Sequence, residues 1–489
     1  MVSRVRYLLA VVVTANLVSP VVATESEVLG GDSGHSDVVD EEFYDDEFMF
    51  DEEPSSMSES ESRGATNNSA LNMWYLFRDP AQITLKHQLA YGLKHERPLV
   101  ANRASIRLQW EKGFGGGLFF RADAKSSFDG VYEQSKYQDN ETVKQAKQEY
   151  QQQNEVREFF LQGSRADYSI SVGQQVIVWG KADGAVVTDI ISPRNVTESV
   201  FTTVEDSRLG QTMIIAHYYE ELFNASKSQQ QWSFILNPDV RVNQYAMPGH
   251  PYYVSPAGIE NAIIEQDDPE FSIEHGELGL RWTYTEGKFD IAIMAADVVE
   301  DDPVFEWIGI TPSFQPVIST FYGRYQMLGG GVNIGVGNFV IKSELAYKNN
   351  RHLNTGDMLD ITQRSIWDAA AGFDYDASGV FDASVELSHQ HVMNWNDSFA
   401  GVERNSSTLY GAVGRYYNND TVRLQYTASL QLQNMQSLHR LETSWDVDDQ
   451  LAVSIQWDHF STRSSAPTTS FLTQLEALDR ILLQLTYDF

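Results

Sequence analysis

The sequence predicts an all-β fold, an antiparallel transmembrane β-barrel of about 18 strands (roughly 16 to 18) that follows an acidic N-terminal tail. Two observations predict this fold. Apolar residues recur at every second position through much of the 489-residue chain, as they do in strands with one apolar face. After the first 23 residues, no apolar run reaches the roughly 18 residues that a membrane-spanning helix requires.

The clearest strand is the end of the chain, residues 481–489. Ile481, Leu483, Leu485, Tyr487 and Phe489 share one face of it. Because lipid cannot hydrogen-bond a bare backbone, such a strand needs partners on both edges, and we expect it to close the barrel against the first strand. An aromatic end in this register resembles the signal by which the barrel-assembly machinery of Gram-negative bacteria recognises outer-membrane barrels, which makes Tyr487 and Phe489 the expected assembly signal. The alternative is an edge strand of a soluble sheet.

Composition excludes several classes of site and partner. The chain has no cysteine, which argues against a disulfide scaffold and against thiolate metal sites. Its formal net charge is -33, which argues against nucleic-acid binding. We expect no metal, no other cofactor and no catalytic residue.

The first 23 residues predict a signal peptide. Arg4 and Arg6 supply the positive start, an apolar core begins at Leu8, and small or compact residues precede a cut after Ala23. A short membrane anchor is the alternative.

Residues 24–68 predict an acidic, disordered periplasmic tail. Between Thr24 and Arg63 there are 15 acidic residues and one basic residue, so the segment repels itself and has few apolar groups that could collapse. Within it, residues 40–53 place five apolar side chains in a field of acids, and these are the expected partner-docking residues. They are Phe43, Tyr44, Phe48, Met49 and Phe50. A solvated tail and a plug that folds into the lumen are the alternatives.

Residues 69–489 form the predicted barrel, with clear alternation from Gln82 onward. Short turns are expected near residues 113, 165, 286, 337, 378, 419 and 448. Longer loops are expected at 128–154, 179–210, 237–275, 299–319, 349–363, 393–406 and 461–480. Short connections at one end and long ones at the other are typical of outer-membrane barrels, in which the short turns are periplasmic. An even number of strands then places both the tail and the C-terminus in the periplasm.

Aromatic residues near the strand ends predict two girdles at the membrane interfaces. The expected girdle beside the short turns comprises Tyr284, Phe289, Tyr375, Phe381, Tyr416, Trp445, Tyr487 and Phe489. The expected girdle beside the long loops comprises Tyr347, Trp367, Trp395, Trp457 and Phe460.

The inward face of the predicted strands carries charges of both signs. A polar lumen accounts for them, and so does a permeation path whose charges select the solute. The lumen charges singled out are Arg107, Arg281, Lys342, Glu344, Asp382, Glu386 and Arg423.

The most distinctive segment is 155–219. It contains S-V-G-Q-Q-V-I-V-W-G-K-A-D-G from Ser171, D-I-I-S-P-R-N from Asp189 and E-D-S-R-L-G-Q from Glu205. These blocks resemble a domain-of-unknown-function family of outer-membrane barrels whose members are often encoded beside RND-type transporters and an outer-membrane lipoprotein. The resemblance is specific over 173–211 and loose over the rest. It implies an 18-strand-like barrel that moves a lipophilic or polymeric product across the outer membrane, and no catalytic residue carries over.

Charged residues in this segment predict a constriction. Arginine pairs with carboxylates through bidentate hydrogen bonds. We expect such a network to fold a loop into the barrel mouth, with Trp179, Gly180 and Lys181 ending the preceding strand. The expected network comprises Lys181, Asp183, Arg194, Glu205, Asp206 and Arg208. The alternative is a purely structural clamp.

The prediction from sequence is therefore an outer-membrane channel or export conduit that contacts outer-membrane lipid and works with a periplasmic or inner-membrane transporter or lipoprotein. A lipid-modifying enzyme and a surface receptor or adhesin are the alternatives. His389 and His391, on one strand face, are the residues that an enzyme or a metal site would use, although an interfacial role also accounts for them. Residues 141–157 predict a polar, solvated helix on a long loop.

Overall fold

The computed structural model describes residues 81–94, 99–134, 141–222, 228–254, 262–269, 271–272, 276–355, 360–377, 379–399, 401–462 and 475–489. The predicted signal peptide at 1–23, the acidic tail at 24–68 and the docking residues Phe43, Tyr44, Phe48, Met49 and Phe50 lie outside the described residues.

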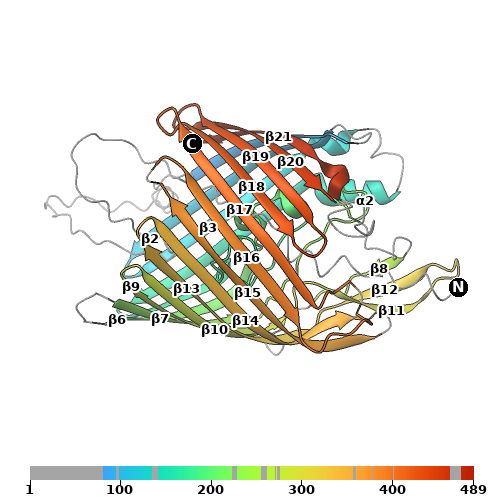
Figure 1. Cartoon of the computed structure of the whole chain (residues 1–489), viewed down its shortest axis with the longest axis horizontal. Coiled ribbons are helices and arrows are strands. Elements are labelled where there is room, and N and C mark those ends of the chain that lie inside the picture. The colour runs from blue at the N-terminus through green and yellow to red at the C-terminus, as the bar shows by residue number, and fades with distance from the viewer. Residues whose placement is uncertain are drawn as a thin grey trace, which may run out of the picture. The chain divides into compact units, whose positions relative to one another are not determined.

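Eighteen tilted antiparallel strands form one closed barrel (Figure 1), which confirms the predicted fold class and strand number. They are β1 (Gln82–Gly92), β2 (Leu99–Gly115), β3 (Leu118–Asp129), β4 (Gln152–Arg165), β5 (Tyr168–Gln175), β6 (Gln211–Leu222), β7 (Ser228–Asn237), β9 (Glu277–Glu286), β10 (Phe289–Val299), β13 (Arg324–Val336), β14 (Phe339–Asn354), β15 (Ile361–Asp376), β16 (Asp382–Val392), β17 (Asn405–Tyr417), β18 (Val422–Gln431), β19 (Gln436–Asp446), β20 (Leu451–Ser461) and β21 (Arg480–Asp488).

The barrel closes through the C-terminal strand, as the sequence predicts. β21 pairs with β20 on one edge and with β1 on the other, where the register runs from Thr84 opposite Asp488 to Gly92 opposite Arg480. The backbone N–H of Phe489 extends this ladder by donating to the carbonyl of Ile83 at 3.0 Å. Closure leaves no strand edge to be satisfied by lipid.

The connections at the two ends of the barrel differ in length. At one end, which we call the turn end, β9–β10 and β13–β14 are joined by two-residue turns, and both the start of β1 and the C-terminus lie there. At the other end, the loop end, long connections follow β3, β5, β7, β10 and β20. This alternation confirms the predicted order of short and long connections.

The long connections contain the remaining elements. A three-stranded sheet is formed by β8 (Ile263–Glu265), β11 (Val304–Ile310) and β12 (Pro316–Phe321), and it projects from the loop end (Figure 1). The helical segments are η2 (Gly130–Glu133), α2 (Glu141–Tyr150), η4 (Ser199–Phe201), α3 (Val204–Ser207) and η5 (Glu476–Leu478). No helix among the described residues is both long enough and apolar enough to cross a membrane.

The predicted helix within 141–157 forms as α2, and β4 begins at Gln152. The prediction that it is solvated all round is wrong. Ala146 is fully buried and Tyr150 nearly so, against Val131 and Tyr132 of η2. The short apolar face escaped the sequence analysis because it covers only two turns.

Large apolar side chains cover the outer face of the barrel. They remain two-fifths exposed or more, since no described residue covers them. Examples from strands all around the barrel are Ile106, Phe159, Ile170, Phe234, Leu278, Ile293, Leu328, Ile341, Leu387, Ile455 and Leu485. A belt of this kind is typical of a surface in contact with lipid.

The aromatic girdles are confirmed in part. At the turn end, Tyr375 packs its ring against Phe339 at 4.6 Å and against Phe381 at 5.6 Å. Near the loop end, Trp367 and Trp457 are each 39% exposed on the outer face. Phe460, however, is fully buried in the interior, and Trp395 packs within the loop that follows β16. Both lie close to a loop, where alternation alone does not fix the direction of a side chain.

Candidate functional site: a loop that crosses the lumen

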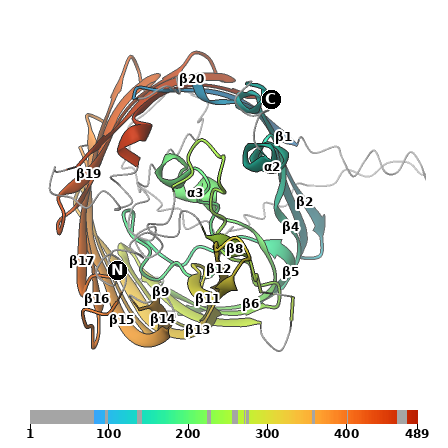
Figure 2. The same cartoon turned by 90° about the vertical axis from the view of Figure 1, so that its right-hand side faces the viewer.

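Residues 176–210, which connect β5 to β6, form a loop inside the ring of strands (Figure 2), and we call it the inner loop. β5 ends at Gln175, four residues earlier than Trp179, so the predicted strand end at 179–181 is wrong. The apolar alternation continues past Gln175 because Ile177 and Trp179 pack into the interior instead of facing outward.

Two carboxylates of the barrel wall hold the start of the inner loop. Glu344 of β14 accepts hydrogen bonds from the backbone N–H groups of Lys181 and Ala182, the latter at 2.8 Å. Glu386 of β16 accepts from the N–H groups of the next two residues, 183 and 184, each at 2.9 Å. In the closed order of strands, β16 lies eight strands from β5, nearly half of the circumference. The inner loop therefore crosses the lumen.

The glycines of the W-G-K-A-D-G motif are explained by these contacts. A Cβ atom at Gly184 would lie 2.8 Å from Cβ of Tyr410 on β17, and one at Gly180 would lie 2.8 Å from Cβ of Asp189. Both positions need a residue without a side chain for the loop to approach its neighbours. The motif thus allows the backbone N–H groups of the loop to reach carboxylates.

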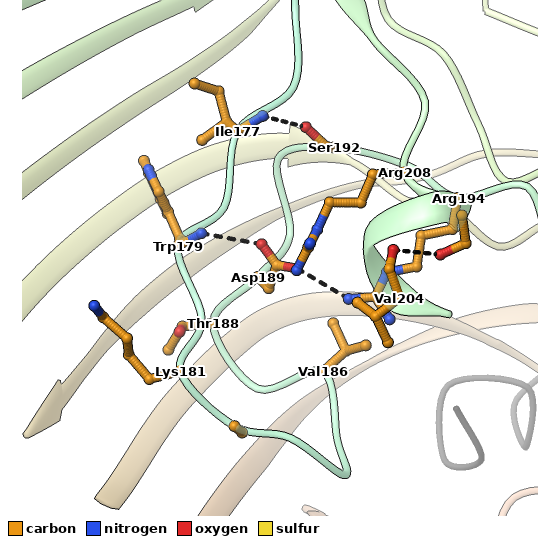
Figure 3. Close-up of polar contacts among 12 residues, drawn as sticks. Ile177, Trp179, Lys181, Val186, Thr188, Asp189, Ser192, Arg194, Val204 and Arg208 are labelled. Carbon is orange, nitrogen blue, oxygen red and sulfur yellow. Dashed lines mark hydrogen bonds and ion pairs between the residues drawn. The ribbon is translucent and has the colours of Figure 1, made fainter. Parts of the chain in front are cut away.

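Asp189 is the centre of the inner loop (Figure 3). One of its carboxylate oxygens accepts from the backbone N–H of Trp179 at 3.0 Å, and the other accepts from Arg194 and Arg208, each at 2.9 Å. Burial by itself raises the pKa of Asp189, but the two guanidinium groups outweigh burial and hold the pKa below its usual value. Asp189 lies in the quoted motif D-I-I-S-P-R-N, yet the predicted network omits it.

An apolar cluster, which we call the loop core, joins the inner loop to the wall. Trp179, Val187, Ile190 and Ile191 of the loop pack against the inner face of strands β6 to β15. The wall contributes Met213, Ile215, Ile235, Met294, Ala296, Val298, Tyr325, Met327, Ala346 and Ala370. In this sector, the expectation of a polar lumen is wrong, because the strands are apolar on both faces. Strands with two apolar faces lack simple alternation, so this sector was not recognisable from the sequence.

The middle of the inner loop is anchored to a second sector of the wall. Glu198 forms an ion pair with Arg103 of β2, and the carbonyl of Val200 accepts from Arg440 of β19 at 3.0 Å. The Arg480 guanidinium of β21 stacks on the Phe201 ring at 3.8 Å.

The returning arm of the inner loop meets a third sector. Arg157 of β4 donates to the backbone carbonyls of Glu205 at 2.7 Å and Asp206 at 3.0 Å, at the end of α3. The Asp206 carboxylate lies 3.7 Å from Nζ of Lys86 on β1. Burial opposes ionisation of Asp206, but nearby cations led by Lys86 hold its pKa well below its usual value.

The structure brings the six predicted network residues together as three groups. Arg194 and Arg208 meet on Asp189. Lys181 and Asp183 instead reach wall residues, with Lys181 3.8 Å from Asp290 and Asp183 paired with Lys342. Glu205 and Asp206 lie in α3 on the returning arm.

The predicted lumen charges lie on the inner wall, and most of them have a partner. Arg107 pairs with Asp123, and Arg423 with Asp382 at 3.2 Å. Lys342, Glu344 and Glu386 bind the inner loop as described. Arg281 is the exception, since no described hydrogen bond or ion pair reaches it. At the chain end, the rings of Tyr487 and Phe489 meet at 4.7 Å.

The histidines named for an enzyme or metal site bond to neighbours on the next strand. Nδ1 of His389 lies 2.8 Å from Oγ of Ser407, and Nδ1 of His391 lies 2.7 Å from Oδ1 of Asn405. Within the described ranges, no group of three or more metal-binding side chains occurs. Each histidine therefore has a polar partner on the neighbouring strand.

A second inner segment, residues 238–254, packs on the inner loop. Gln244 and Arg194 are hydrogen-bonded through their backbones at 2.9 Å, and His250 packs its ring on that of Tyr150 at 4.5 Å. Nδ1 of His250 accepts from the backbone N–H of Tyr252 at 3.2 Å. Burial lowers the pKa of His250 to about 4, since the charged form has little access to water.

We expect acid to release the 238–254 segment. In the undocked state, His250 takes up a proton near its ordinary pKa of about 6.5, whereas the docked imidazole stays neutral down to about pH 4. Docking is therefore at full strength above about pH 6.5 and weakens as the pH falls toward 4, by about 3 kcal/mol in all. Hydrogen exchange of 238–254 between pH 7.5 and 4.5, corrected for intrinsic rates, measures this. A His250→Asn variant keeps a neutral acceptor and should lose the response; an unchanged response would contradict this assignment.

Several solved structures are similar to this chain. The solved structures similar to this chain include OccAB3 of Acinetobacter baumannii, at 9% identity and a TM-score of 0.46, with 84% of this chain and 98% of that chain covered. OccAB1 of the same organism matches at 8% identity and a TM-score of 0.47, covering 84% and 95%. The outer membrane channel DcaP of that organism matches at 9% identity and a TM-score of 0.38, covering 84% and 96%. Each likeness concerns the fold alone.

Curated protein sequences contain no significant match to this chain. A family model described as "Protein of unknown function (DUF1302)" matches residues 43–487. Because that match spans nearly the whole chain, from before β1 into β21, the protein belongs to the DUF1302 family.

Proposed function

We propose that this protein is an outer-membrane channel whose passage is narrowed by the inner loop. The observation that carries the proposal is the path of that loop, which leaves β5, docks on Glu344 and Glu386 across the lumen, and returns past Arg103 and Arg157. A barrel of about 18 strands is wide enough to hold either water or a plug. A loop tied to three sectors of the wall sets how much of that width is open.

The apolar outer belt supports insertion into lipid, and the unequal connections support an orientation. Short turns are periplasmic in outer-membrane barrels. The turn end would then face the periplasm together with the C-terminus and the N-terminal tail, and the loop end would face outward. Tyr487 and Phe489 would serve as the signal for the barrel-assembly machinery.

The solute and the partner follow from the resemblance. A lipophilic or polymeric solute would pass with the help of an RND-type transporter or a lipoprotein, and the aromatic residues of the acidic tail would dock on that partner. The loop core supports the lipophilic choice, since movement of the inner loop would expose apolar wall residues such as Met213, Ile235 and Met294 to the passage.

Planar-bilayer conductance of the purified protein, with and without residues 24–66, tests the proposal. Steady openings of the full-length protein mean a channel that conducts without a partner. Conductance only after deletion makes the tail a plug. Silence in both forms assigns closure to the inner loop if the loop variants described below conduct, and contradicts a channel if they do not.

A further inference from the structure

Arg281, on the inner face of β9, is a largely buried cation to which the described part of the chain offers no partner. Its side chain is 9% exposed, and its Nε is sealed from solvent without a hydrogen bond. Among the described contacts, neither a hydrogen bond nor an ion pair reaches the guanidinium. The acids on the same strand and the next one bond elsewhere. Glu277 accepts from Asn237 at 2.7 Å, and Asp290 accepts from Thr285 at 2.6 Å.

Arg351 and Arg423 also have an Nε sealed without a hydrogen bond, but each forms an ion pair, whereas the described residues show none for Arg281. Arg440 and Arg480 share Asp458 at 2.7 and 2.9 Å, and Arg107 pairs with Asp123. Arg157 donates to two backbone carbonyls. An isolated, largely buried charge is costly in a protein, and an anion that joins it would offset that cost.

The surroundings of Arg281 are polar but uncharged on one side. The strand register aligns it with Ser233 of β7, which is aligned in turn with His217 of β6 and Ser169 of β5. Oγ of Ser233 lies 2.9 Å from Nδ1 of His217 and accepts from Gln231 at 3.1 Å. No carboxylate lies in this row. On the other side, the register partner of Arg281 is the apolar Met294 of β10.

Arg281 lies beside the inner loop. A Cβ atom at Gly279, two residues nearer the loop end, would lie 2.8 Å from the indole of Trp179. β9 ends at Glu286, five residues beyond Arg281. Lys181 of the inner loop lies 3.8 Å from Asp290, which pairs with Thr285 on the turn-end side of Arg281, so Arg281 lies alongside the inner loop.

We propose that Arg281 is a binding site for the carboxylate group of a solute, with Ser233 and Gln231 beside it. The planar guanidinium fork matches a carboxylate with two parallel hydrogen bonds, which a point charge does not. This inference deepens the proposed channel function, on which it rests, by naming the class of solute. The chain as a whole is negative, with a net charge of -33. The guanidinium of Arg281 nevertheless attracts one anionic group at one point of the wall.

The test is calorimetric titration of the full-length protein in detergent with benzoate and with benzamide. The two probes have the same shape and differ in the carboxylate. Benzoate should bind and benzamide should bind at least about tenfold more weakly, as loss of a charged hydrogen-bonding group predicts. Equal affinities, or no binding of benzoate, would overturn the site.

Variants separate a binding site from a structural role. Arg281→Gln should weaken benzoate binding about tenfold or more, and Arg281→Lys should recover only part of it. Arg165→Gln, at the exposed last residue of β4, makes the same change in charge and should leave binding unaltered. Without benzoate, Arg281→Gln should melt no lower than the parent, since it removes an unpaired charge. A large fall in melting temperature, or unchanged benzoate affinity in Arg281→Gln, would overturn the assignment.

The binding test and the conductance test can fail independently of each other. If benzoate binds through Arg281 but neither the parent protein nor its loop variants conduct in a bilayer, the channel function is wrong and the site stands. If the protein conducts but benzoate binds no better than benzamide, the channel stands and the site is wrong.

Discussion

Replacing Glu344 and Glu386 together by glutamine is expected to raise the single-channel conductance several-fold. These two carboxylates accept five hydrogen bonds from the inner loop, including one from the Thr188 hydroxyl at 2.9 Å. A glutamine amide keeps one acceptor oxygen and replaces the other by a donor, so at Glu386 one of the two backbone N–H groups loses its acceptor, and at both positions the negative charge is lost. Each buried donor left without a partner costs about 1–3 kcal/mol, so the docked state of residues 181–184 becomes the less stable one.

Single-channel recording and hydrogen exchange of residues 177–191 measure the two parts of this prediction. Glu306→Gln, at an exposed glutamate on β11, makes the same chemical change away from the inner loop and serves as the matched control. If the double variant conducts like the parent while residues 177–191 exchange faster, the loop opens without widening the path, and its position is not what limits the passage.

Replacing Asp189 by alanine is expected to weaken docking of the inner loop by about 3–5 kcal/mol, the range for removing one partner of a buried ion pair. Both Arg194 and Arg208 lose their carboxylate, and the N–H of Trp179 loses its acceptor. Asp189→Asn also removes the negative charge that pairs with the two arginines, so we expect it to weaken docking by about as much. Its amide oxygen can still accept from the N–H of Trp179. Hydrogen exchange and heat resistance of the barrel in detergent measure the change.

Acid should mimic this substitution only at extreme pH. The pKa of Asp189 is lowered in the fold, so its contribution is present above its ordinary pKa of about 3.9 and is lost as the pH falls below that. The control for Asp189→Ala is Asp449→Ala, which removes an exposed carboxylate in the turn between β19 and β20. Arg208→Ala separates the two roles of this network: altered conductance means constriction, and unchanged conductance with lower heat resistance means a clamp. Undiminished protection of the inner loop in Asp189→Ala would contradict its central place.

The strands were predictable because their signal is local. Val422 to Gln431 alternates without a fault and forms β18, and the C-terminal residues form β21 in the predicted register. The order of short and long connections was predictable for the same reason. The signal fails where both faces of a strand are apolar, as at Met294, and near loops, as at Phe460, because the direction of a side chain there depends on what packs against it.

The candidate site was predictable only in outline. The quoted motifs do mark the inner loop, but the grouping of its charges was wrong, and Asp189 was overlooked beside the arginines that it joins. Glu344 and Glu386 were singled out as lumen charges without their role as anchors. Arg281 was singled out as well, although nothing in the sequence distinguishes an unpaired arginine from a paired one.

The sequence by itself determined the barrel, the approximate number of its strands, its closure through β21 and the segment that carries its unusual chemistry. Each of these depends on periodicity or on residues adjacent in the chain. Only the tertiary structure decided where the inner loop docks, which charges pair and which one does not. The reason is distance along the chain: the bonds from Ala182 to Glu344 and from Asp183 to Glu386 join residues 162 and 203 positions apart, and closure of the barrel alone brings them together.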